Sequence, residues 1–286
     1  MKRTFFIPVV LALFFLLSFS IVQAEEDPLP KWVKRIEYSI QLETDKKPTF
    51  YFQTVQPLTQ DEEKKDTIFI QPRVNIRDER GIYNLGLGYR KLASEDWIVG
   101  VNTFLDYQDL HRHARAGLGF EVLGQILEGR VNTYFGGLTN KKEADFSAAS
   151  RTIERVADGI DYELGAPVPY MSWLKIYGSG FWYDFKSFDD KLGWKSRLEA
   201  SLNEHVQLEV YTWDDNKGDL EYGGRLRLNV AFNTFSDILG AVKFSQEAFP
   251  RNDLKERLLI PVEREYDIIL ERKVESSGFV VEAGRS

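Results

Sequence analysis

Two histidines form the pattern in this sequence that most resembles a metal site. His111 and His113 are two residues apart, and in an extended segment such residues share a face. Asp106 and Asp109 precede them, and an acidic loop could supply a third ligand, because zinc binds imidazole nitrogen and carboxylate oxygen. The alternative is a solvated outer loop, which the sequence favours because only two imidazoles are available. We therefore predict neither a metal site nor a cofactor.

A serine and a histidine lie close enough in the sequence to suggest an esterase. Ser201 and His205 could act as nucleophile and base, although such a site also needs a polar group that orients the base. A short turn between neighbouring strands explains the same two residues at least as well. The sequence contains no glycine-rich phosphate loop. We therefore predict that the protein is not an enzyme.

The composition indicates β structure and argues against a nucleic-acid partner. Of the 286 residues, 14% are aromatic and 21 are glycines, a mixture that suits sheets with tight packing. The formal net charge of -7 offers no basic face, so we predict no binding to nucleic acid. The absence of cysteine excludes disulfides, thiolate metal ligands and a lipid-modified cysteine.

The N-terminus has the pattern of a secretory signal peptide. Basic residues precede an apolar stretch from Phe5 to Val22, and small residues lead to a predicted cleavage site after Ala24. An uncleaved anchor helix is the alternative, because the apolar run approaches the length that spans a bilayer. We predict residues 1–24 as a signal peptide and residues 25–35 as a short periplasmic segment.

From Ile36 to Phe232 the chain alternates apolar and polar residues with a period of two, which indicates β-strands. In Tyr83–Tyr89, for example, large apolar residues alternate with Asn and Gly. Aromatic residues stand at both ends of such apolar faces, where a membrane barrel has its girdles. About twelve segments follow the pattern, the number depending on how the second is divided. They are Ile36–Glu43, Phe50–Leu58, Thr67–Arg77, Tyr83–Leu92, Trp97–Gln108, Ala114–Leu123, Leu127–Gly136, Gly159–Ala166, Leu174–Phe185, Leu192–Leu202, Val206–Trp213 and Tyr222–Phe232.

The segments suit a membrane barrel better than a soluble sandwich. Most have about ten residues, the length of a tilted transmembrane strand, and even strand numbers are the rule for bacterial barrels. A two-sheet sandwich also alternates, but its strands are shorter and it needs no export signal. We predict an all-β, antiparallel, up-and-down transmembrane barrel over residues 36–232. Its lipid-facing residues include Leu87, Val101, Leu118, Val131 and Leu228.

The lengths of its connections predict the orientation of this barrel in the membrane. If the first strand leaves the periplasm, odd-to-even connections are extracellular, and the longest of these is Gly137–Asp158. The turns at residues 94–96, 124–126 and 203–205 are then periplasmic.

The register of the segment Leu174–Phe185 stays open, because four aromatic residues compete there with Ile176 and Trp182 for the outer face.

Charged residues on the inward faces predict a polar lumen. Opposite charges on neighbouring strands could pair across it, each pair contributing about 0.2 to 1 kcal/mol. One interpretation is an ion-selective channel. The other, which the sequence favours, is a structural network that holds the barrel and binds a plug. The inward arginines and carboxylates are Arg73, Arg90, Arg115, Arg130, Asp106, Glu121, Asp161 and Glu163.

Five glycines on the inward faces of three successive strands mark a second feature of the lumen. Glycine in a strand often marks a close approach by another backbone, so this wall could receive a helix. The alternative is that the glycines relieve curvature or make space for Phe69 and Phe104. They are Gly86, Gly88, Gly100, Gly117 and Gly119.

After Phe232 the pattern changes, and we predict residues 233–286 as a post-barrel linker. Ser236–Ala248 and Asp253–Leu259 are compatible with short helices, Glu265–Val274 is extended, and the last twelve or so residues form a polar, frayed tail. Asp253–Leu259 is the best candidate to enter the lumen, with Val262–Leu270 continuing toward the outer surface. The predicted lumen-lining and plug-contact residues are Gly86, Gly88, Arg90, Gly100, Asp106, Arg115, Gly117, Gly119, Glu121, Arg130, Lys255 and Arg257.

Several motifs, taken in order, resemble one known family. They are Asn84-Leu85-Gly86-Leu87-Gly88-Tyr89-Arg90, the spaced Trp97, Gly100, Asn102, Phe104 and Asp106-Tyr107, then Arg115, Gly117-Leu118-Gly119 and Glu121, Asn132 with Tyr134-Phe135, Asp158–Glu163, Tyr222–Phe232 and Val262–Glu271. Together they resemble the β-domain of inverse autotransporters, the intimin and invasin proteins of Gram-negative outer membranes. The resemblance covers nearly the whole mature chain, from Ile36 to Lys273.

The resemblance implies a twelve-stranded outer-membrane barrel whose post-barrel segment folds back as a helix through the pore. It also implies lipid, periplasmic chaperones and the barrel-assembly machinery as partners. In the family a surface-exposed passenger follows and adheres to an unidentified host or cell-surface ligand, and no passenger is expected within these 286 residues. We therefore expect a membrane anchor or translocation pore for a surface segment, with a passenger-free, porin-like channel as the alternative.

Overall fold

The structure is a computed structural model, and it describes residues 30–78, 80–139, 142–146, 150–229, 242–276 and 279–282, with only the backbone described for 142–146. The predicted signal peptide lies outside the described residues, as do the end of the last predicted strand and residues 236–241 of the first predicted helix. The described remainder of that helix, residues 242–248, is irregular rather than helical.

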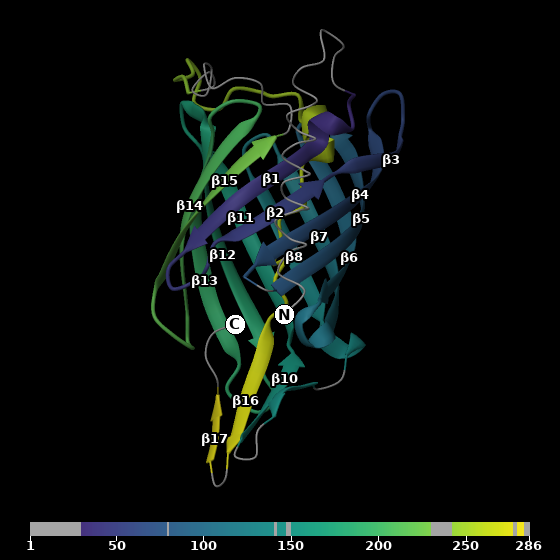
Figure 1. Ribbon diagram of the computed structural model, residues 1–286. Coiled ribbons are helices and arrows are strands. Elements are labelled where there is room, and N and C mark those ends of the chain that lie inside the picture. The colour runs from purple at the N-terminus through teal and green to yellow at the C-terminus, as the bar shows by residue number, and fades with distance from the viewer. Residues whose placement is uncertain are drawn as a thin grey trace, which may run out of the picture.

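One antiparallel sheet closes on itself into a barrel (Figure 1). Each strand pairs with the next along the chain, and closure comes from β1 pairing with β15 and β2 pairing with β4. β2 and β3 both pair with β4 and act as one interrupted strand, so the barrel has twelve. The strands are β1 (Ile36–Glu43), β2 (Thr49–Thr54), β3 (Gln56–Gln60), β4 (Asp66–Arg77), β5 (Arg80–Ser94), β6 (Trp97–Gln108), β7 (His113–Gly124), β8 (Glu128–Phe135), β11 (Asp158–Val168), β12 (Met171–Asp184), β13 (Lys191–Ser201), β14 (Val206–Asp215) and β15 (Glu221–Asn229).

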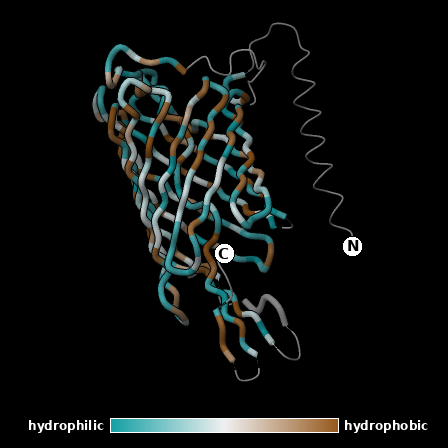
Figure 2. The backbone as a smooth tube through the Cα atoms, turned by 90° about the vertical axis from the view of Figure 1, so that its left-hand side faces the viewer, coloured by the Kyte–Doolittle hydropathy of each residue, from teal (hydrophilic) through white to brown (hydrophobic). Residues whose placement is uncertain are grey.

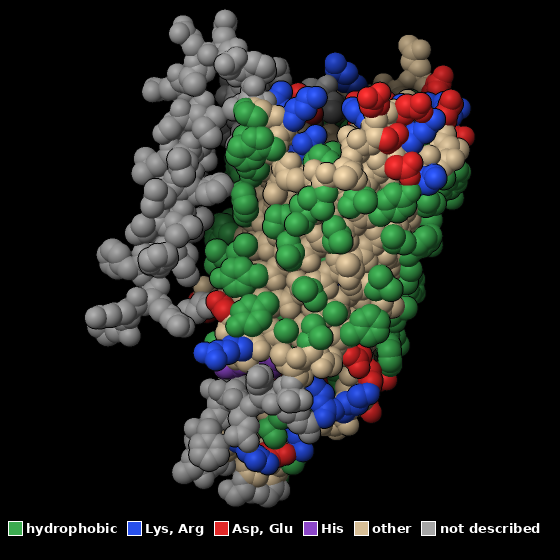
Figure 3. All heavy atoms as spheres, turned by 90° about the vertical axis from the view of Figure 1, so that its right-hand side faces the viewer, with side chains coloured by type: hydrophobic (Ala, Val, Ile, Leu, Met, Phe, Trp, Pro, Cys, Tyr) green, Lys and Arg blue, Asp and Glu red, His purple; other side chains and the backbone are tan. Residues whose placement is uncertain are grey.

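Hydrophobic and hydrophilic residues alternate along the strands (Figure 2). Because successive side chains of a strand point to opposite faces, this alternation gives the barrel an apolar outside and a polar inside. The outward side chains of Leu87, Val101 and Leu118 are 48%, 48% and 57% exposed. On the face that Figure 3 shows, hydrophobic side chains cover the middle of the barrel and charged ones gather at its two ends. This is the surface that a bilayer requires of a spanning barrel.

The strand β12, whose register the sequence left open, has a defined orientation. Tyr177 and Tyr183 are buried on the inward face, whereas Ile176 and Trp182 are exposed on the outward face. The inward tyrosines lie opposite glycines of β11, with Tyr177 paired to Gly165 and Tyr183 to Gly159. A Cβ at either glycine would lie 2.2 Å from its tyrosine ring, so the small residues allow the aromatic rings to face the lumen.

A second, smaller sheet extends beyond one end of the barrel. It contains β9 (Lys142–Phe146), β10 (Ser150–Val156), β16 (Leu270–Ser276) and β17 (Phe279–Glu282), in the order β17, β16, β10, β9. The connection between β8 and β11 supplies β9 and β10, and the end of the chain supplies the other two strands. Residues 279–282, predicted as frayed tail, are therefore a strand, since Phe279, Val280 and Val281 favour extended backbone that pairs with β16.

The helical content of the described residues is limited to short 3-10 turns. These are η1 (Val33–Arg35), η2 (Leu110–Arg112), η3 (Gly136–Leu138) and η5 (Leu254–Leu259). Among the described residues, no helix is long and apolar enough to cross a membrane. η5 lies at one end of the barrel and β16 leaves the other, so the intervening residues cross the lumen (Figure 1).

Candidate functional site: the lumen and the segment that crosses it

Residues 260–269, here called the lumen segment, connect η5 to β16 through the inside of the barrel. The segment hydrogen-bonds with side chains from strands around the wall, including β4, β5, β7, β8 and β15. Buried apolar clusters hold its two ends. Leu254 and Leu258 of η5 pack on Ile98 and Leu123, and Ile269 packs in a cluster with Tyr183 at the other end.

The lumen segment has irregular, non-helical backbone, which corrects the helix that the family resemblance implied. In the described part of the post-barrel chain, helix is confined to η5, which has six residues and ends two residues before Pro261. A proline ends a helix by removing a backbone donor, and isolated turns of this length have little stability of their own. The backbone groups of a segment without helix or strand pairing need partners elsewhere, and the polar wall supplies them. For example, Gln71 accepts from the backbone N–H of Val262 at 2.9 Å, and Asn84 donates to the carbonyl of Tyr266 at 3.1 Å.

Arg264 is the central cation of the lumen segment. Its guanidinium donates to both carboxylate oxygens of Asp106, at 3.0 and 2.9 Å. Arg115 donates to the same carboxylate at 2.9 Å and, through a second nitrogen, to the carbonyl of Glu265 at 2.8 Å. The Asp106 side chain is fully buried, so these two arginines supply the compensating charge that a buried carboxylate requires.

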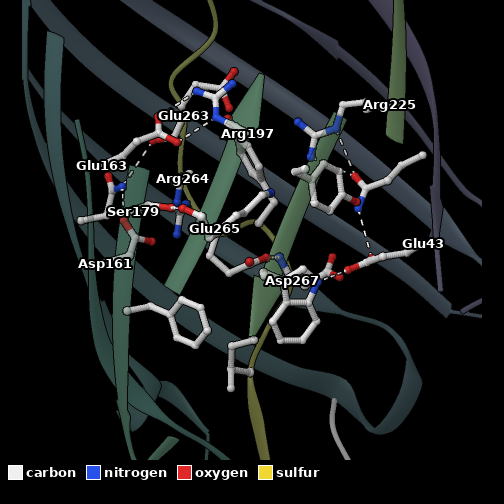
Figure 4. A pocket seen from close by; sticks show the side chains of 18 of the residues that line it. Glu43, Asp161, Glu163, Ser179, Arg197, Arg225, Glu263, Arg264, Glu265 and Asp267 are labelled. Atoms are coloured by element: carbon white, nitrogen blue, oxygen red, sulfur yellow. Dashed lines mark hydrogen bonds and ion pairs between the residues drawn. The ribbon is translucent and has the colours of Figure 1, made fainter. Parts of the chain in front are cut away.

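Glu263 faces the opposite wall, where Arg197 of β13 lies near it in Figure 4 and Arg227 of β15 binds it. Arg227 donates to Glu263 at 2.7 Å and to Glu209 at 3.4 Å. Arg197 joins the same network, since it donates to Glu163 at 2.8 Å and to Glu209 at 3.2 Å. Adjacent residues of the lumen segment thus carry opposite charges toward opposite walls, which fixes the rotation of the segment about its own axis.

Tyr266 anchors the segment to the wall that carries Phe104. Its ring packs edge-on against Phe104 at 6.0 Å and lies 4.0 Å from the guanidinium of Arg73. Its hydroxyl accepts from Gln71 at 2.7 Å and donates to the carbonyl of Val262. The ring is therefore packed and the hydroxyl is hydrogen-bonded, as expected for a buried tyrosine.

At the η5 end, Arg90 and Glu121 hold the chain where it enters the lumen. Their side chains are fully buried, with the Arg90 Nε and a Glu121 oxygen 2.7 Å apart. Arg90 also donates to the carbonyls of Leu258 and Ile260, at 3.1 and 2.6 Å. The pair spans β6 at Gly100, where a Cβ would lie 2.7 Å from Glu121. Glycine is needed at this position so that the ion pair can pass over the strand.

The other inward glycines mostly accommodate side chains of the barrel rather than the post-barrel backbone. A Cβ at Gly86 would meet Phe104, one at Gly88 would meet Phe69, and one at Gly119 would meet two asparagines of adjacent strands. Gly117 is the exception, because its Cβ would lie 2.7 Å from the Arg264 guanidinium. The helix-docking interpretation is therefore wrong for this wall as a whole, and the alternative, space for the two phenylalanines, describes Gly86 and Gly88.

Of the remaining predicted site residues, Arg130 and Arg257 pair with inward carboxylates and Lys255 does not. Arg130 donates to Glu163 at 2.7 Å and lies 3.5 Å from Glu128. Arg257 forms an ion pair with Glu128, so it reaches an inward carboxylate as predicted from the sequence. Lys255 does not, since among the described residues no carboxylate lies within ion-pair distance of it, and its backbone N–H bonds only to Asp253, the residue that caps η5.

Two cavities lie along one side of the lumen segment. One, of about 190 Å³, is the pocket drawn in Figure 4, and its lining comes from β1, β2, β4, β8 and β11 to β15, including Ser179, Lys195 and Trp213. The other, of about 470 Å³, lies toward η5 and is lined by residues such as Lys175 and Asn203. Glu263 borders both. Residues of β5 to β7 line neither cavity, so the segment fills the lumen unevenly and packs most closely on that part of the wall.

The histidine pair lies at the β10 end of the barrel, where His113 is fully buried and His111 is partly exposed, which corrects the expectation of a solvated loop for His113. Nδ1 of His111 and Nε2 of His113 lie 2.8 and 2.7 Å from the same oxygen of Glu154, in β10. Arg272 of β16 donates to the other oxygen at 2.9 Å. Burial by itself raises the pKa of Glu154, but hydrogen bonds from His113 and His111 and the charge of Arg272 outweigh it and lower the pKa to about 2. Asp109 instead binds the backbone of Gly81.

The serine and histidine that suggested an esterase are not arranged as a catalytic pair. Both border the larger cavity, at the turn between β13 and β14. The ring nitrogen of His205 lies 3.3 Å from its sequence neighbour Glu204, and no hydrogen bond joins it to Ser201 in the part of the chain that the structure describes.

Sequence reasoning did not single out the two charged residues that bind the lumen segment to opposite walls of the barrel. The sequence predicts Lys255 and Arg257 as contacts and places Glu263 and Arg264 only within the linker motif. One signal was present in the sequence. Charged residues stand between the apolar anchors Val262 and Tyr266, in a segment with no helical period. This spacing indicates an extended chain whose side chains meet two different walls.

Comparison with known proteins identifies the barrel. Residues 17–266 match the inverse autotransporter β-domain. The chain belongs to this family. An attaching and effacing protein homolog of Escherichia coli (strain K12) is 30% identical over 139 residues, which are 49% of this chain and 45% of that protein. The inverse autotransporter match is to a barrel domain rather than to an enzyme.

Solved structures share the fold. A chain from work on the in-meso crystallization of membrane proteins superposes with a TM-score of 0.65 at 21% identity, covering 83% of this chain and 99% of that one. A KdgM porin gives a TM-score of 0.48 at 9% identity, covering 68% and 98%. Family and fold place this inverse autotransporter β-domain in the outer membrane, where its apolar outer face meets lipid.

Proposed function

We propose that this barrel anchors and exports a surface-exposed segment of its own chain. The observation that carries the proposal is the continuous path of residues 254–276, from η5 at one end, through the lumen, to β16 beyond the other end. A porin has no need of a chain that crosses its pore, whereas an autotransporter must move its own chain through the barrel. The ion pairs of Glu263 with Arg227 and of Arg264 with Asp106 then hold the chain in place after export.

The orientation follows from the same path. The η5 end, with the short turns at residues 94–96 and 124–127, faces the periplasm, and the β10 end, with the long β8–β11 connection, faces the medium. The sheet of β9, β10, β16 and β17 is then the first structure on the cell surface. Residues 1–24 direct export and are removed, residues 36–232 form the barrel, and residues 233–286 are the linker.

Partners follow from the route that such a barrel takes. Periplasmic chaperones and the barrel-assembly machinery deliver it to the membrane. Whatever the exported segment carries meets a host or cell-surface ligand, in an adhesin- or invasin-like role. The lumen residues Arg90, Asp106, Arg115 and Glu121 bind the chain in transit and at rest, rather than a diffusing solute.

An epitope attached after Ser286 tests this function. On intact cells the epitope binds an external antibody and is removed by external protease, because the chain leaves the barrel at the surface. The same epitope placed after Glu25 serves as the periplasmic control and stays protected until the outer membrane is permeabilised. Protection of the C-terminal epitope together with exposure of the N-terminal one would contradict the proposal.

A channel is the second candidate function, and the two cavities beside the lumen segment favour it. Both border Glu263, so a modest displacement of that side chain would join them along the β12–β15 wall. Single-channel recording of purified protein separates the candidates. A seated lumen segment predicts closed or briefly flickering pores, and steady current from the intact chain would favour the channel.

A further inference from the structure

The cluster at the β10 end has a donor set that the lumen network does not use. The imidazoles of His111 and His113 and a carboxylate oxygen of Glu154 lie within 4.8 Å of one another. The two rings stand nearly perpendicular, at 89°, and both present a nitrogen to the same carboxylate oxygen. Two of the three histidines in the whole chain converge on this point.

We propose that His111, His113 and Glu154 bind a divalent transition-metal cation of the zinc class. Two imidazole nitrogens and one carboxylate oxygen are ligands that zinc takes at about 2.0 to 2.2 Å, with water in a fourth, tetrahedral position. Tetrahedral ligands at that distance lie about 3.3 Å apart. The ion therefore requires the two nitrogen–oxygen distances to widen from 2.7 and 2.8 Å by about half an ångström, and the two nitrogens, which lie within 4.8 Å of each other, to stand about 3.3 Å apart.

The backbone around the cluster holds the ligands in position. His113 begins β7 and its side chain is fully buried, whereas His111 lies in η2 and is about one quarter exposed. His111 and Arg112 both have left-handed backbone, with φ of 61° and 55°, a conformation that non-glycine residues rarely adopt. This turn is what brings the second imidazole back onto Glu154. The exposed edge of His111 gives an ion access from solvent.

The surroundings of the site favour a transition metal over calcium or magnesium. Those ions prefer sites made of oxygen ligands, whereas two of the three donors here are nitrogen. Arg272 binds the second oxygen of Glu154 at 2.9 Å, which orients the carboxylate as outer hydrogen bonds do around metal ligands. Its positive charge also limits the affinity for a cation.

Metal binding would join three parts of the molecule at the barrel exit. The ligands come from η2, from the first residue of β7, and from β10, and Arg272 links Glu154 to β16, the strand that continues from the lumen segment. An ion here stabilises the small sheet against the barrel rim, where the chain emerges.

Zinc binding to the folded, detergent-solubilised chain tests the site. After treatment with a chelator, titration with ZnCl2 followed by calorimetry should give one ion per chain. His113→Gln and Glu154→Gln should weaken binding by at least about tenfold, as loss of a ligand does. His205→Gln is the matched control, because that histidine also neighbours a glutamate but lies at the other end of the barrel, and it should bind like the native chain.

Two further measurements keep the test decisive. The shift in gel mobility on heating reports whether each variant is a folded barrel, and His111→Gln, at the more exposed ligand, substitutes for His113→Gln if the latter does not fold. X-ray absorption at the zinc edge should show only nitrogen and oxygen neighbours, including imidazole. No binding by the native chain, or equal binding by the native chain and the His111 and Glu154 variants, would overturn the proposal.

Discussion

A single methyl group at Gly117 should loosen the chain in the lumen. A Cβ added to this glycine would lie 2.7 Å from the Arg264 Nη2, which itself lies 2.9 Å from Asp106. Ordinary contact requires Nη2 to retreat by about 0.7 Å, and a retreat directed away from Asp106 takes this nitrogen beyond hydrogen-bonding distance of its carboxylate oxygen. Hydrogen bonds to charged groups contribute about 1.5 to 3 kcal/mol, so Gly117→Ala should shift the ratio of displaced to seated lumen segment by about 10- to 150-fold.

Single-channel recording of the purified Gly117→Ala protein in planar bilayers measures this shift as an increase in open probability. Gly178→Ala is the matched control, since it is also a strand glycine but a Cβ there would have no atom within 4 Å. Limited proteolysis gives a second readout, because a displaced segment is cut while the barrel stays intact. Equal open probability and equal cleavage in the two variants would refute the idea that the Arg264–Asp106 contact holds the chain in place.

The remaining predictions concern the membrane face, the wall and the orientation. Leu118→Arg should cost about 2 to 4 kcal/mol and prevent stable insertion, whereas Leu118→Phe should insert, and equal refolding yields in lipid vesicles would contradict a lipid-facing Leu118. Glu121→Gln leaves Arg90 buried without its charged partner and should lower the free energy of unfolding by about 3 to 5 kcal/mol, measured by urea titration in vesicles; no change would contradict the role of this pair. An epitope inserted near Lys142 should be labelled on intact cells, and labelling at Glu95 instead would reverse the orientation.

The strands were predictable because each obeys a local rule. In β1 and β6 the predicted and observed bounds coincide, since a period of two over eight to twelve residues specifies both the extended backbone and the face that each side chain takes. The contact between Arg115 and Asp106 follows from the same rule, because the two residues lie opposite each other on one face of the neighbouring strands β6 and β7. Arg90 and Glu121 share the inward face but lie two strands apart, and they meet because Gly100 between them has no side chain.

The contacts that depend on distant parts of the chain were not predictable in this way. Glu154 meets the histidines across about forty residues, through a long connection that has no fixed period. The conformation of η5 and the lumen segment is set by the wall rather than by local preference. The same composition that suggested a helix at Asp253–Leu259 gives only a 3-10 turn, because the segment ends at a proline and its partners lie on the barrel.

The threading of the chain from the periplasm to the surface is tested most directly by cysteine labelling on intact cells. The native chain has no cysteine and so gives no background. Val280 in β17 and Glu63 in the turn between β3 and β4 are both well exposed and lie at opposite ends of the barrel. With a maleimide too large to cross the outer membrane, Val280→Cys should be labelled on intact cells and Glu63→Cys only after permeabilisation. Labelling of Glu63→Cys but not Val280→Cys on intact cells, or of neither until permeabilisation, would contradict the account.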